Sequence, residues 1–341
     1  MQWSRRLPIS SASPAVTKMA EGASRKPVVR HLAIIGQGLI GSSITRAVYE
    51  RRLAREVTIT DASPKVRKRL LELGLGQARV VATSAEAVKD ADLVIVCIPV
   101  ASFVDAVREL APHMKPGAIL SDVGSVKETM VEEALPLIPE GVHFVPAHPL
   151  AGTEFSGPDA GLPRLFVNRW AILTPPEGTD TEAVETLRAF WEGLGSQVEV
   201  MTPLRHDQAL AITSHLPHLI AFSIFHTGLH MEEETGSPVI QFSAGAFRDF
   251  TRVAASNPVM WRDIFLKNKD AVLDVFKRFE ADIGECVKAI EDGDGEALEQ
   301  MFTTSRRTRR KVIDTDHISL RDNRPSEDLA DTILRPYASD D

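Results

Sequence analysis

The fold is decided by the stretch His31-Leu-Ala-Ile-Ile-Gly36-Gln-Gly38-Leu-Ile-Gly41-Ser42. An apolar run typical of a strand leads into three glycines, and the residues after them predict the start of a helix. The first glycine permits the tight turn, the second lets a pyrophosphate approach the backbone, and the third lets helix and strand pack closely. Free N–H groups at the helix N-terminus also attract anions. We therefore expect a dinucleotide site formed by Gly36, Gly38, Leu39, Ile40 and Gly41.

An acidic residue strengthens this interpretation. Asp61 follows Gly41 by twenty residues and comes directly after Val57-Thr-Ile-Thr60, which predicts the second strand. A carboxylate there accepts hydrogen bonds from both ribose hydroxyls and repels a 2′-phosphate, so NAD is expected rather than NADP. The alternative is a chance glycine turn with a solvated acid. The strand, turn, helix and acid in register argue against it.

Composition bounds the remaining possibilities. The chain has 341 residues, of which 43% are hydrophobic and 25% charged, which is ordinary for about two domains with real cores. Its net charge of −8 without a basic patch argues against a nucleic-acid partner. An anionic substrate must then be attracted by local cations.

The cysteines and the hydropathy of the chain indicate the cellular compartment of the protein. The two cysteines, Cys97 and Cys286, lie in apolar patterns and fit buried thiols in a reducing compartment, so we expect a cytoplasmic protein. No apolar stretch approaches the roughly 18 residues of a membrane span, and no membrane partner is expected.

The two ends differ in composition from the rest of the chain. The first twenty residues contain Arg5, Arg6 and Lys18 but no acid, a composition that is weakly similar to a transit peptide. A disordered leader over 1–29 is the simpler interpretation. The polar segment 316–341 is expected to be a disordered, solvated tail.

Short apolar runs recur after the glycine turn, with helical patterns between them, as far as residue 202. This alternation predicts an α/β domain over 30–202, of the Rossmann type, with a doubly wound and mostly parallel sheet. Ligands of such sheets gather at the carboxyl ends of the strands. The runs are Val80-Val81, Leu93-Val-Ile-Val-Cys-Ile98, Ala118-Ile-Leu120, Val142-His-Phe-Val145 and Ala171-Ile-Leu173.

Helical patterns replace strands from Pro203 onward, which predicts an all-helical second domain over 203–315. Its clearest helix carries apolar residues at spacings of three and four, which suits core packing or a subunit interface. The stripe is Val272, Phe276, Phe279, Ile283, Val287 and Ile290.

Polar residues that follow the strands are the candidates for chemistry in the first domain. Pro99, the segment Asp122-Val-Gly-Ser125-Val-Lys127 and the segment Ala147-His148-Pro149-Leu-Ala-Gly-Thr153-Glu154 each follow an expected strand. They should converge at one edge of the sheet. His148 there could transfer a proton, because the ordinary histidine pKa of about 6.5 suits neutral pH. On position alone, a loop histidine that bonds to local backbone is the more common case.

The helical region holds further candidates. They are Thr213-Ser-His215-Leu-Pro-His218, Ala246-Phe-Arg248-Asp249-Phe-Thr-Arg252 and Asn257-Pro-Val-Met-Trp261-Arg262-Asp263. Either Arg248 or Arg252 could anchor a carboxylate, or could instead pair with Asp249 or Asp263.

A metal site is the less favoured interpretation of the histidines. His215, His218, His226 and His230 lack an accompanying carboxylate or thiolate at ligand spacing. We expect no metal, and we expect His226 and His230 to be ordinary residues on a helix face.

Together these motifs resemble the prephenate/arogenate dehydrogenase family of tyrosine biosynthesis, over about residues 30 to 313. The resemblance implies a Rossmann domain with an all-helical dimerisation domain, a homodimer, NAD or NADP as oxidant, and no metal. The histidine motif carries Leu150 where the family often has Met, a change of similar size and polarity.

The resemblance also implies roles for individual residues. His148 accepts a hydrogen bond from the 4-hydroxyl of the substrate and draws off its proton as hydride leaves C4 and carbon dioxide departs. Ser125 orients that hydroxyl or His148, Arg252 binds the ring carboxylate, and Arg248 is structural. The pocket is completed by His215, Thr153, Glu154 and Trp261, with His218 a weaker candidate.

Some alternatives stay open. The resemblance does not separate prephenate from arogenate. A β-hydroxyacid-type dehydrogenase also joins a Rossmann domain to helices, but it should carry a catalytic lysine in the helical part. A non-enzymatic NAD-binding protein would lack polar residues converging near the nicotinamide.

Overall fold

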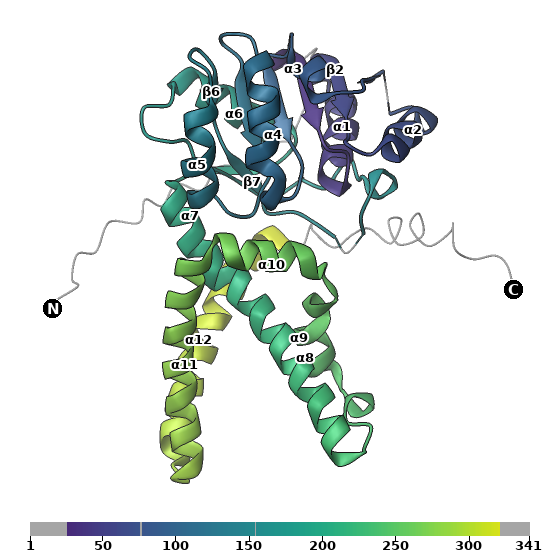
Figure 1. Ribbon diagram of the computed structural model, residues 1–341. Coiled ribbons are helices and arrows are strands. Elements are labelled where there is room, and N and C mark those ends of the chain that lie inside the picture. The colour runs from purple at the N-terminus through teal and green to yellow at the C-terminus, as the bar shows by residue number, and fades with distance from the viewer. Residues whose placement is uncertain (1–25, 76, 154, 321–341) are drawn as a thin grey trace, which may run out of the picture.

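The computed structural model describes residues 26–75, 77–153 and 155–320. It has two parts, an α/β part and a helical part whose long helices extend away from the first part (Figure 1). The first 25 residues of the expected leader, and the expected tail from residue 321, lie outside the described residues.

The first sheet has six strands in the order β3-β2-β1-β4-β5-β6, and all its pairs are parallel. Central β1 carries Ile34 opposite Ile59 of β2 and Ile95 of β4, so both of its edges are paired along a buried apolar row. The strands are β1 (Val29–Ile35), β2 (Ala54–Thr60), β3 (Arg79–Val80), β4 (Leu93–Val96), β5 (Ile119–Asp122) and β6 (His143–Phe144).

Helices cover both faces of this sheet, so the predicted doubly wound Rossmann-type fold is confirmed. One face packs on α1 (Leu39–Arg51), α2 (Pro64–Leu73) and α6 (Thr181–Gly193). The other face packs on α3 (Ser84–Val88), α4 (Phe103–Leu110) and α5 (Glu128–Ala134). The strands are apolar on both faces because both are buried.

A second, three-stranded sheet lies beside the first and was not predicted. It consists of β7 (Ala147–Pro149), β8 (Trp170–Leu173) and β9 (Gln197–Val200), with β7 antiparallel and β9 parallel to β8. The chain leaves the first sheet at Pro146, which has no N–H to continue the ladder. The run 171–173 is therefore a strand, but of this second sheet. His148 lies in a short strand rather than in a loop.

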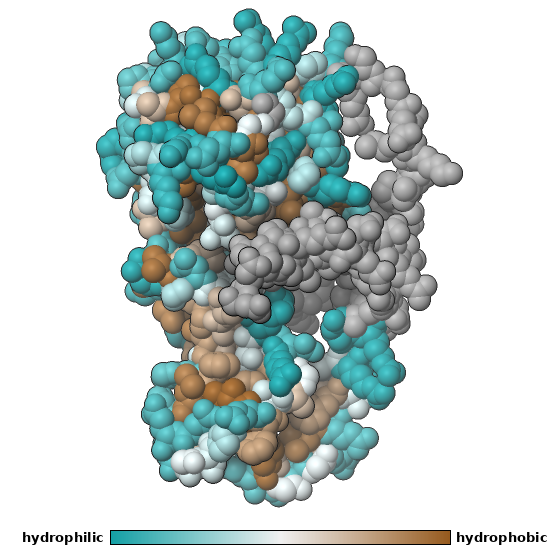
Figure 2. All heavy atoms as spheres, turned by 90° about the vertical axis from the view of Figure 1, so that its right-hand side faces the viewer, coloured by the Kyte–Doolittle hydropathy of each residue, from teal (hydrophilic) through white to brown (hydrophobic). Residues whose placement is uncertain are grey.

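The helical part begins at Pro203. Its helices are α7 (Pro203–Leu210), α8 (Leu216–Thr235), α9 (Gly245–Thr251), α10 (Pro258–Lys267), α11 (Lys269–Glu291) and α12 (Gly295–Leu320). The last helix thus continues past residue 316, and β1 already includes Val29. Figure 2 shows apolar residues, drawn brown, on the surface of this part.

A π-helical turn at Ala211–His215 joins α7 to α8. Pro217 follows it in the first turn of α8, and without an N–H it cannot bond to the carbonyl four residues earlier. Such turns widen a helix and recur at functional sites. Here the turn carries the Thr-Ser-His motif.

The helical run Pro203–Thr235 corrects one expectation. By length and composition alone it qualifies as a membrane span among the described residues, with 28% of its most apolar window buried. Core helices of soluble proteins meet the same criterion, so the signal is weak.

The glycine turn yields a stability prediction. A Cβ at Gly41 would overlap the carbonyl oxygen of Gly36, whereas a Cβ at Gly38 would meet no heavy atom within 4 Å. We expect Gly41→Ala to lower the free energy of unfolding by about 1–3 kcal/mol, since the overlap outweighs the gain in helix propensity. Gly38→Ala is the matched control and should cost less than about 1 kcal/mol in denaturant unfolding. Equal losses for the two variants would contradict the close helix–strand contact.

Candidate active site

The predicted dinucleotide residues meet at one edge of the sheet. Gly36 to Gly41 lie between β1 and α1, while Asp61 follows β2 and Pro99 follows β4, the two neighbours of β1. Gly36 has a φ of +90°, and a Cβ there would overlap the carbonyl oxygen of Cys97. The turn is thus closed behind Gly36 and open at Gly38. This shape fits a pyrophosphate above the N-terminus of α1.

Asp61 is held toward this turn. One carboxylate oxygen accepts a 2.9 Å hydrogen bond from the amide of Gln37, and the other accepts one from the amide of Ser63 at 2.9 Å. The Gln37 side chain is buried, and its Nε2 has no hydrogen-bond partner among the described residues. The arrangement provides the acidic group that an adenosine ribose requires.

A cleft of about 780 Å³ lies between the two parts of the molecule. Its walls come from the turn after β5, from β7 and the loop that follows it, from the π-helical turn and α8, and from the segment 252–264. The predicted residues that line it are Ser125, His148, Thr153, His218, Arg252 and Trp261. The structure therefore brings together residues separated by more than one hundred positions.

Two predicted residues are placed otherwise. Glu154 lies outside the described residues. His215 does not line the cleft; only 1% of it is exposed, and its Nδ1 accepts a 3.0 Å hydrogen bond from Nδ2 of Asn268. His218, expected to be the weaker candidate, is the histidine of this motif that reaches the cleft.

An aromatic cluster forms one wall of the cleft. The His218 ring stacks on Trp261 with centroids 3.7 Å apart, and His215 meets the edge of Trp261 at 6.0 Å. Burial lowers the pKa of His215 to about 4. Burial, and to a lesser degree the Arg252 guanidinium, lower the pKa of His218. Both rings are neutral at neutral pH.

His148 is joined to two residues that sequence reasoning missed. Its Nδ1 lies 2.8 Å from Nε2 of His206, and Nδ1 of His206 lies 2.7 Å from a carboxylate oxygen of Asp207. His206 and Asp207 are at most 1% exposed, and His148 is 9% exposed. Their contact depends on how α7 docks onto the sheet, so no local pattern could have identified them.

A buried ion pair supports this chain of residues. Nζ of Lys127 lies 2.6 Å from Oδ2 of Asp122, and neither side chain is more than 1% exposed. Asp122 also accepts hydrogen bonds from the amides of Gly124, at 2.6 Å, and Ala147, at 3.2 Å. It thereby fixes the turn that carries Ser125 and the strand that carries His148.

The electrostatics keep His148 neutral. Burial lowers its pKa well below 6.5, and His206, Lys127 and His215 lower it further. A neutral imidazole is the form that accepts a proton. The Cys97 thiol, by contrast, has its pKa raised by burial and is no nucleophile.

The two arginines of the Phe-Arg-Asp-Phe-Thr-Arg motif are separated by the structure. Both side chains are exposed, but Arg252 lines the cleft, whereas Arg248 does not and forms no ion pair with any residue in the described part of the chain. Asp263 pairs with its neighbour Arg262 at 2.7 Å. In this single chain α9 leaves Arg248 exposed, so the expectation that Arg248 is structural gains no support from the described contacts.

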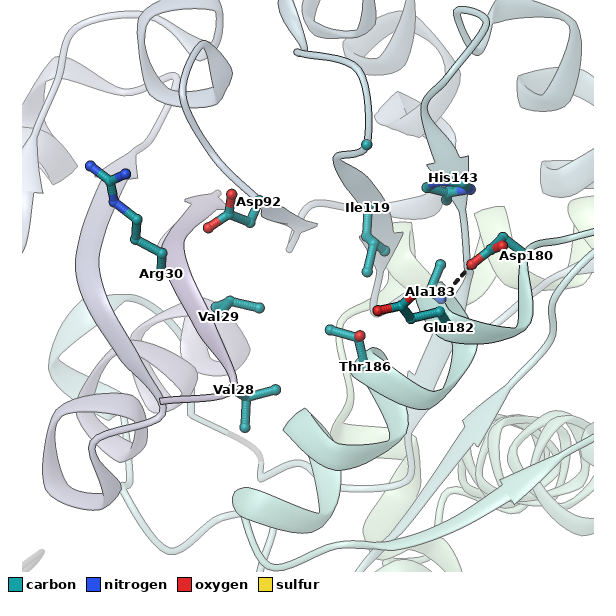
Figure 3. A pocket seen from close by; sticks show the side chains of 11 residues that line it. Val28, Val29, Arg30, Asp92, Ile119, His143, Asp180, Glu182, Ala183 and Thr186 are labelled. Carbon is teal, nitrogen blue, oxygen red and sulfur yellow. Dashed lines mark hydrogen bonds between the residues drawn. The ribbon is translucent and has the colours of Figure 1, made fainter. Parts of the chain in front are cut away.

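A second hollow, of about 430 Å³, opens at the opposite edge of the sheet, beside α6 (Figure 3). Its polar groups serve the fold. Asp180 accepts a hydrogen bond from the amide of Ala183 at the start of α6, and Asp92 pairs with Lys115. Its histidine, His143 of β6, is only half-buried, and its side chain has no hydrogen bond among the described residues.

His226 and His230 lie together on α8, with ring centroids 4.1 Å apart. Within the described ranges, no group of three or more histidine, cysteine, aspartate or glutamate side chains is arranged to hold a metal ion.

Comparison with known proteins matches both parts of the chain. Residues 44–200 match the nucleotide-binding domain of prephenate dehydrogenase, and residues 202–304 match its dimerization domain. A cyclohexadienyl dehydrogenase of Zymomonas mobilis is 41% identical over 85% of this chain and 98% of its own length. A prephenate dehydrogenase of Bacillus subtilis is 36% identical over 81% of this chain and 74% of its own.

Solved structures of the same family are similar to this chain. Prephenate dehydrogenase from Aquifex aeolicus, crystallised with hydroxyphenyl propionate and NAD+, superposes with a TM-score of 0.76 at 29% identity, over 85% of this chain and all of the other. An arogenate dehydrogenase from Synechocystis superposes with a TM-score of 0.70 at 26% identity, over 83% of this chain and 99% of the other. The glycine turn, the cleft and these matches over both parts together place the chain in the prephenate dehydrogenase family.

Proposed function

We propose that this protein oxidises and decarboxylates prephenate, arogenate or both, with NAD as hydride acceptor. The observation that carries the proposal is a buried, neutral His148 in a cleft that also holds Arg252, at the carboxyl ends of the strands, where the glycine turn also lies. The names of the relatives support the same reaction.

His148 is the proposed base. The substrate is a cyclohexadiene with a 4-hydroxyl and a ring carboxylate. The hydroxyl proton passes to His148 as the C4–H electron pair leaves as hydride, and the bond to the carboxylate breaks to release carbon dioxide. The electron pair of that broken bond completes the aromatic ring. The former hydroxyl oxygen, now a phenolate, takes the proton back from His148. Proton transfer of this kind contributes roughly 10²–10⁴-fold to a rate.

The other cleft residues bind and orient the substrate in this proposal. Arg252 holds the ring carboxylate, and Ser125 orients the hydroxyl beside His148. Thr153, His218 and Trp261 complete the wall of the pocket. Glu154, next to Thr153 in the sequence, stays a prediction. His215 acts from behind the wall, where it supports Trp261.

NAD, when bound, supplies the hydride-accepting nicotinamide. Its pyrophosphate would be held by Gly36, Gly38, Leu39, Ile40 and Gly41, and its ribose by Asp61. Pro99 would contact the cofactor where it extends toward the cleft. The Asp61 carboxylate favours NAD over NADP because a 2′-phosphate would face a like charge.

The alternatives receive no support from the cleft. A β-hydroxyacid-type dehydrogenase requires a catalytic lysine from the helical part, and no lysine lines the cleft among the described residues. A non-enzymatic NAD-binding protein would have no need of a buried histidine beside an arginine there.

The direct test is to mix purified protein with prephenate or arogenate, and with NAD or NADP, and to follow the absorbance of the reduced cofactor. We expect reduction of NAD with at least one of the two substrates. No reduction with any of the four combinations would contradict the proposal. The ratio of kcat/KM for the two substrates then identifies the preferred one.

A homodimer formed through the helical part completes the proposal. The stripe on α11 packs inward at Val272 but leaves Ile283, Val287 and Ile290 between 45% and 66% exposed in the single chain. An exposed apolar surface of this kind suits a subunit interface. The free thiols Cys97 and Cys286 also support a cytoplasmic location.

Replacing Ile290 with Glu should weaken this dimer, because a charge would be buried in an apolar interface. Light scattering across a dilution series should show more monomer than for the wild type. Lys277→Glu, on an exposed side of the same helix, is the control. A dimer unaffected by Ile290→Glu would place the interface elsewhere.

Replacing His148 with Asn should lower kcat by roughly two to four orders of magnitude and leave NAD affinity unchanged. In the wild type, kcat/KM should fall on the acid side, because the base must be unprotonated. Burial lowers the pKa of His148, so this fall should lie below pH 6.5. Activity of the Asn variant within threefold of wild type would refute the assignment.

Arg252→Gln should raise KM by roughly 30-fold, the effect of losing a charge-assisted pair worth about 2 kcal/mol. Arg248→Gln, on the same motif but away from the cleft, should change neither KM nor the free energy of unfolding. Steady-state kinetics and denaturant unfolding measure both. A raised KM for the Arg248 variant alone would reverse the two roles.

A further inference from the structure

We propose that His206 and Asp207 are positioning residues that decide which ring nitrogen of His148 carries its proton. The proposal rests on the function proposed above, in which His148 is the base. It adds that His148 accepts the substrate proton at Nε2. It also adds that the Asp207 carboxylate, linked to His148 through His206, balances the positive charge of protonated His148.

The three groups lie in one line of short contacts. Nδ1 of His148 is 2.8 Å from Nε2 of His206, and the opposite nitrogen of His206 is 2.7 Å from Oδ1 of Asp207. The rings of His148 and His206 meet edge to face, with centroids 5.1 Å apart. Water is excluded from the inner two members, which are at most 1% exposed.

The direction of each hydrogen bond follows from the Asp207 end. Both carboxylate oxygens of Asp207 accept backbone N–H groups, from Lys127 at 2.9 and 3.1 Å and from Glu128 at 2.8 Å. Asp207 is therefore an acceptor, and Nδ1 of His206 must donate to it. A neutral His206 then has a bare Nε2, which can only accept.

It follows that Nδ1 of His148 carries the proton and donates to His206. Nε2 of His148 is left with a free lone pair on the side of the cleft, which is the form required to take the proton of a substrate hydroxyl. Burial lowers the pKa values of His148 and His206, in keeping with two neutral rings.

The line of residues is fixed from both parts of the molecule. The amides of Lys127 and Glu128 come from the start of α5, while Asn268, between α10 and α11, donates from Nδ2 to the carbonyl oxygen of Asp207 at 3.0 Å. The Asp207 side chain cannot rotate away without breaking the hydrogen bonds from the two amides.

When His148 takes up a proton, the new charge needs a partner. The charged or titratable groups around it are His206, Lys127, His215, Asp122 and Asp207. Asp122 is paired with Lys127, so Asp207 is the carboxylate available through His206. A carboxylate that accepts a hydrogen bond from the neighbour of an imidazolium stabilises it without itself becoming protonated.

Three variants test the proposal. His206→Leu removes the acceptor and should lower kcat by roughly 100-fold with KM unchanged. His206→Gln keeps an acceptor for His148 and a donor for Asp207, and should recover roughly tenfold of that loss. Asp207→Asn can donate to His206, reverse the chain and place the proton on Nε2 of His148, so it should be no better than His206→Leu.

The pH profile separates positioning from mere stability. Without the carboxylate, the protonated form of His148 is less stable, so the acid fall of kcat/KM should move to lower pH in Asp207→Asn, which keeps the His206 ring in place. His31→Leu is the control. His31 is half-buried and bonded to Thr58 in the first sheet, so this variant should lose stability without moving the profile.

A spectroscopic measurement makes the result independent of activity. In protein labelled with ¹⁵N-histidine, the ring nitrogen shifts report the tautomer of each neutral histidine. We expect the Nδ1–H tautomer for His148 in the wild type and its loss in Asp207→Asn. The Nε2–H tautomer in the wild type, or kcat of His206→Leu within threefold of wild type, would overturn the proposal. A wild type that shows the Nδ1–H tautomer but oxidises neither substrate would overturn the proposed function instead.

Discussion

The buried ion pair between Asp122 and Lys127 is the interaction on which the rest of the site depends. Two fully buried charges are tolerated only when each has its partner and its remaining hydrogen bonds. Asp122 meets this condition with Lys127 and the amides of Gly124 and Ala147. Because these groups come from β5, the turn after it and β7, the pair holds the two sheets together at the cleft.

A second carboxylate extends this arrangement into the helical part. Asp207 of α7 accepts the amides of Lys127 and Glu128 at the start of α5. A small apolar cluster of Val100, Val126, Trp261 and Ile264 packs across the same junction. The cleft therefore exists only where the two parts meet, and neither part alone contains its full wall.

Much of the fold could be predicted from the sequence, because the glycine turn and the alternation of strands and helices are local patterns. The residues lining the cleft were found through motifs, and the structure brings six of them together. The second sheet was missed because Pro146 redirects the chain after a two-residue strand. His206 and Asp207 were missed because their partners lie about 60 to 80 residues away in the sequence.

The arginine assignment shows the same limit. Spacing on a short helix could not tell which of Arg248 and Arg252 faces the cleft, since that depends on how α9 docks. The family resemblance implies that Arg252 binds the ring carboxylate, and the structure places Arg252 at the cleft. An ion pair was the expectation for Arg248 because charged side chains commonly pair, but the position of α9 leaves its side chain exposed.

The most direct test of the account is a crystal structure of this protein with NAD and a 4-hydroxyphenyl compound that mimics the aromatic product. The account predicts the phenol oxygen within hydrogen-bond distance, about 2.6–3.2 Å, of Nε2 of His148, with Nδ1 still bonded to His206. A ring bound outside this cleft, or a His148 that presents Nδ1 to the phenol, would contradict it.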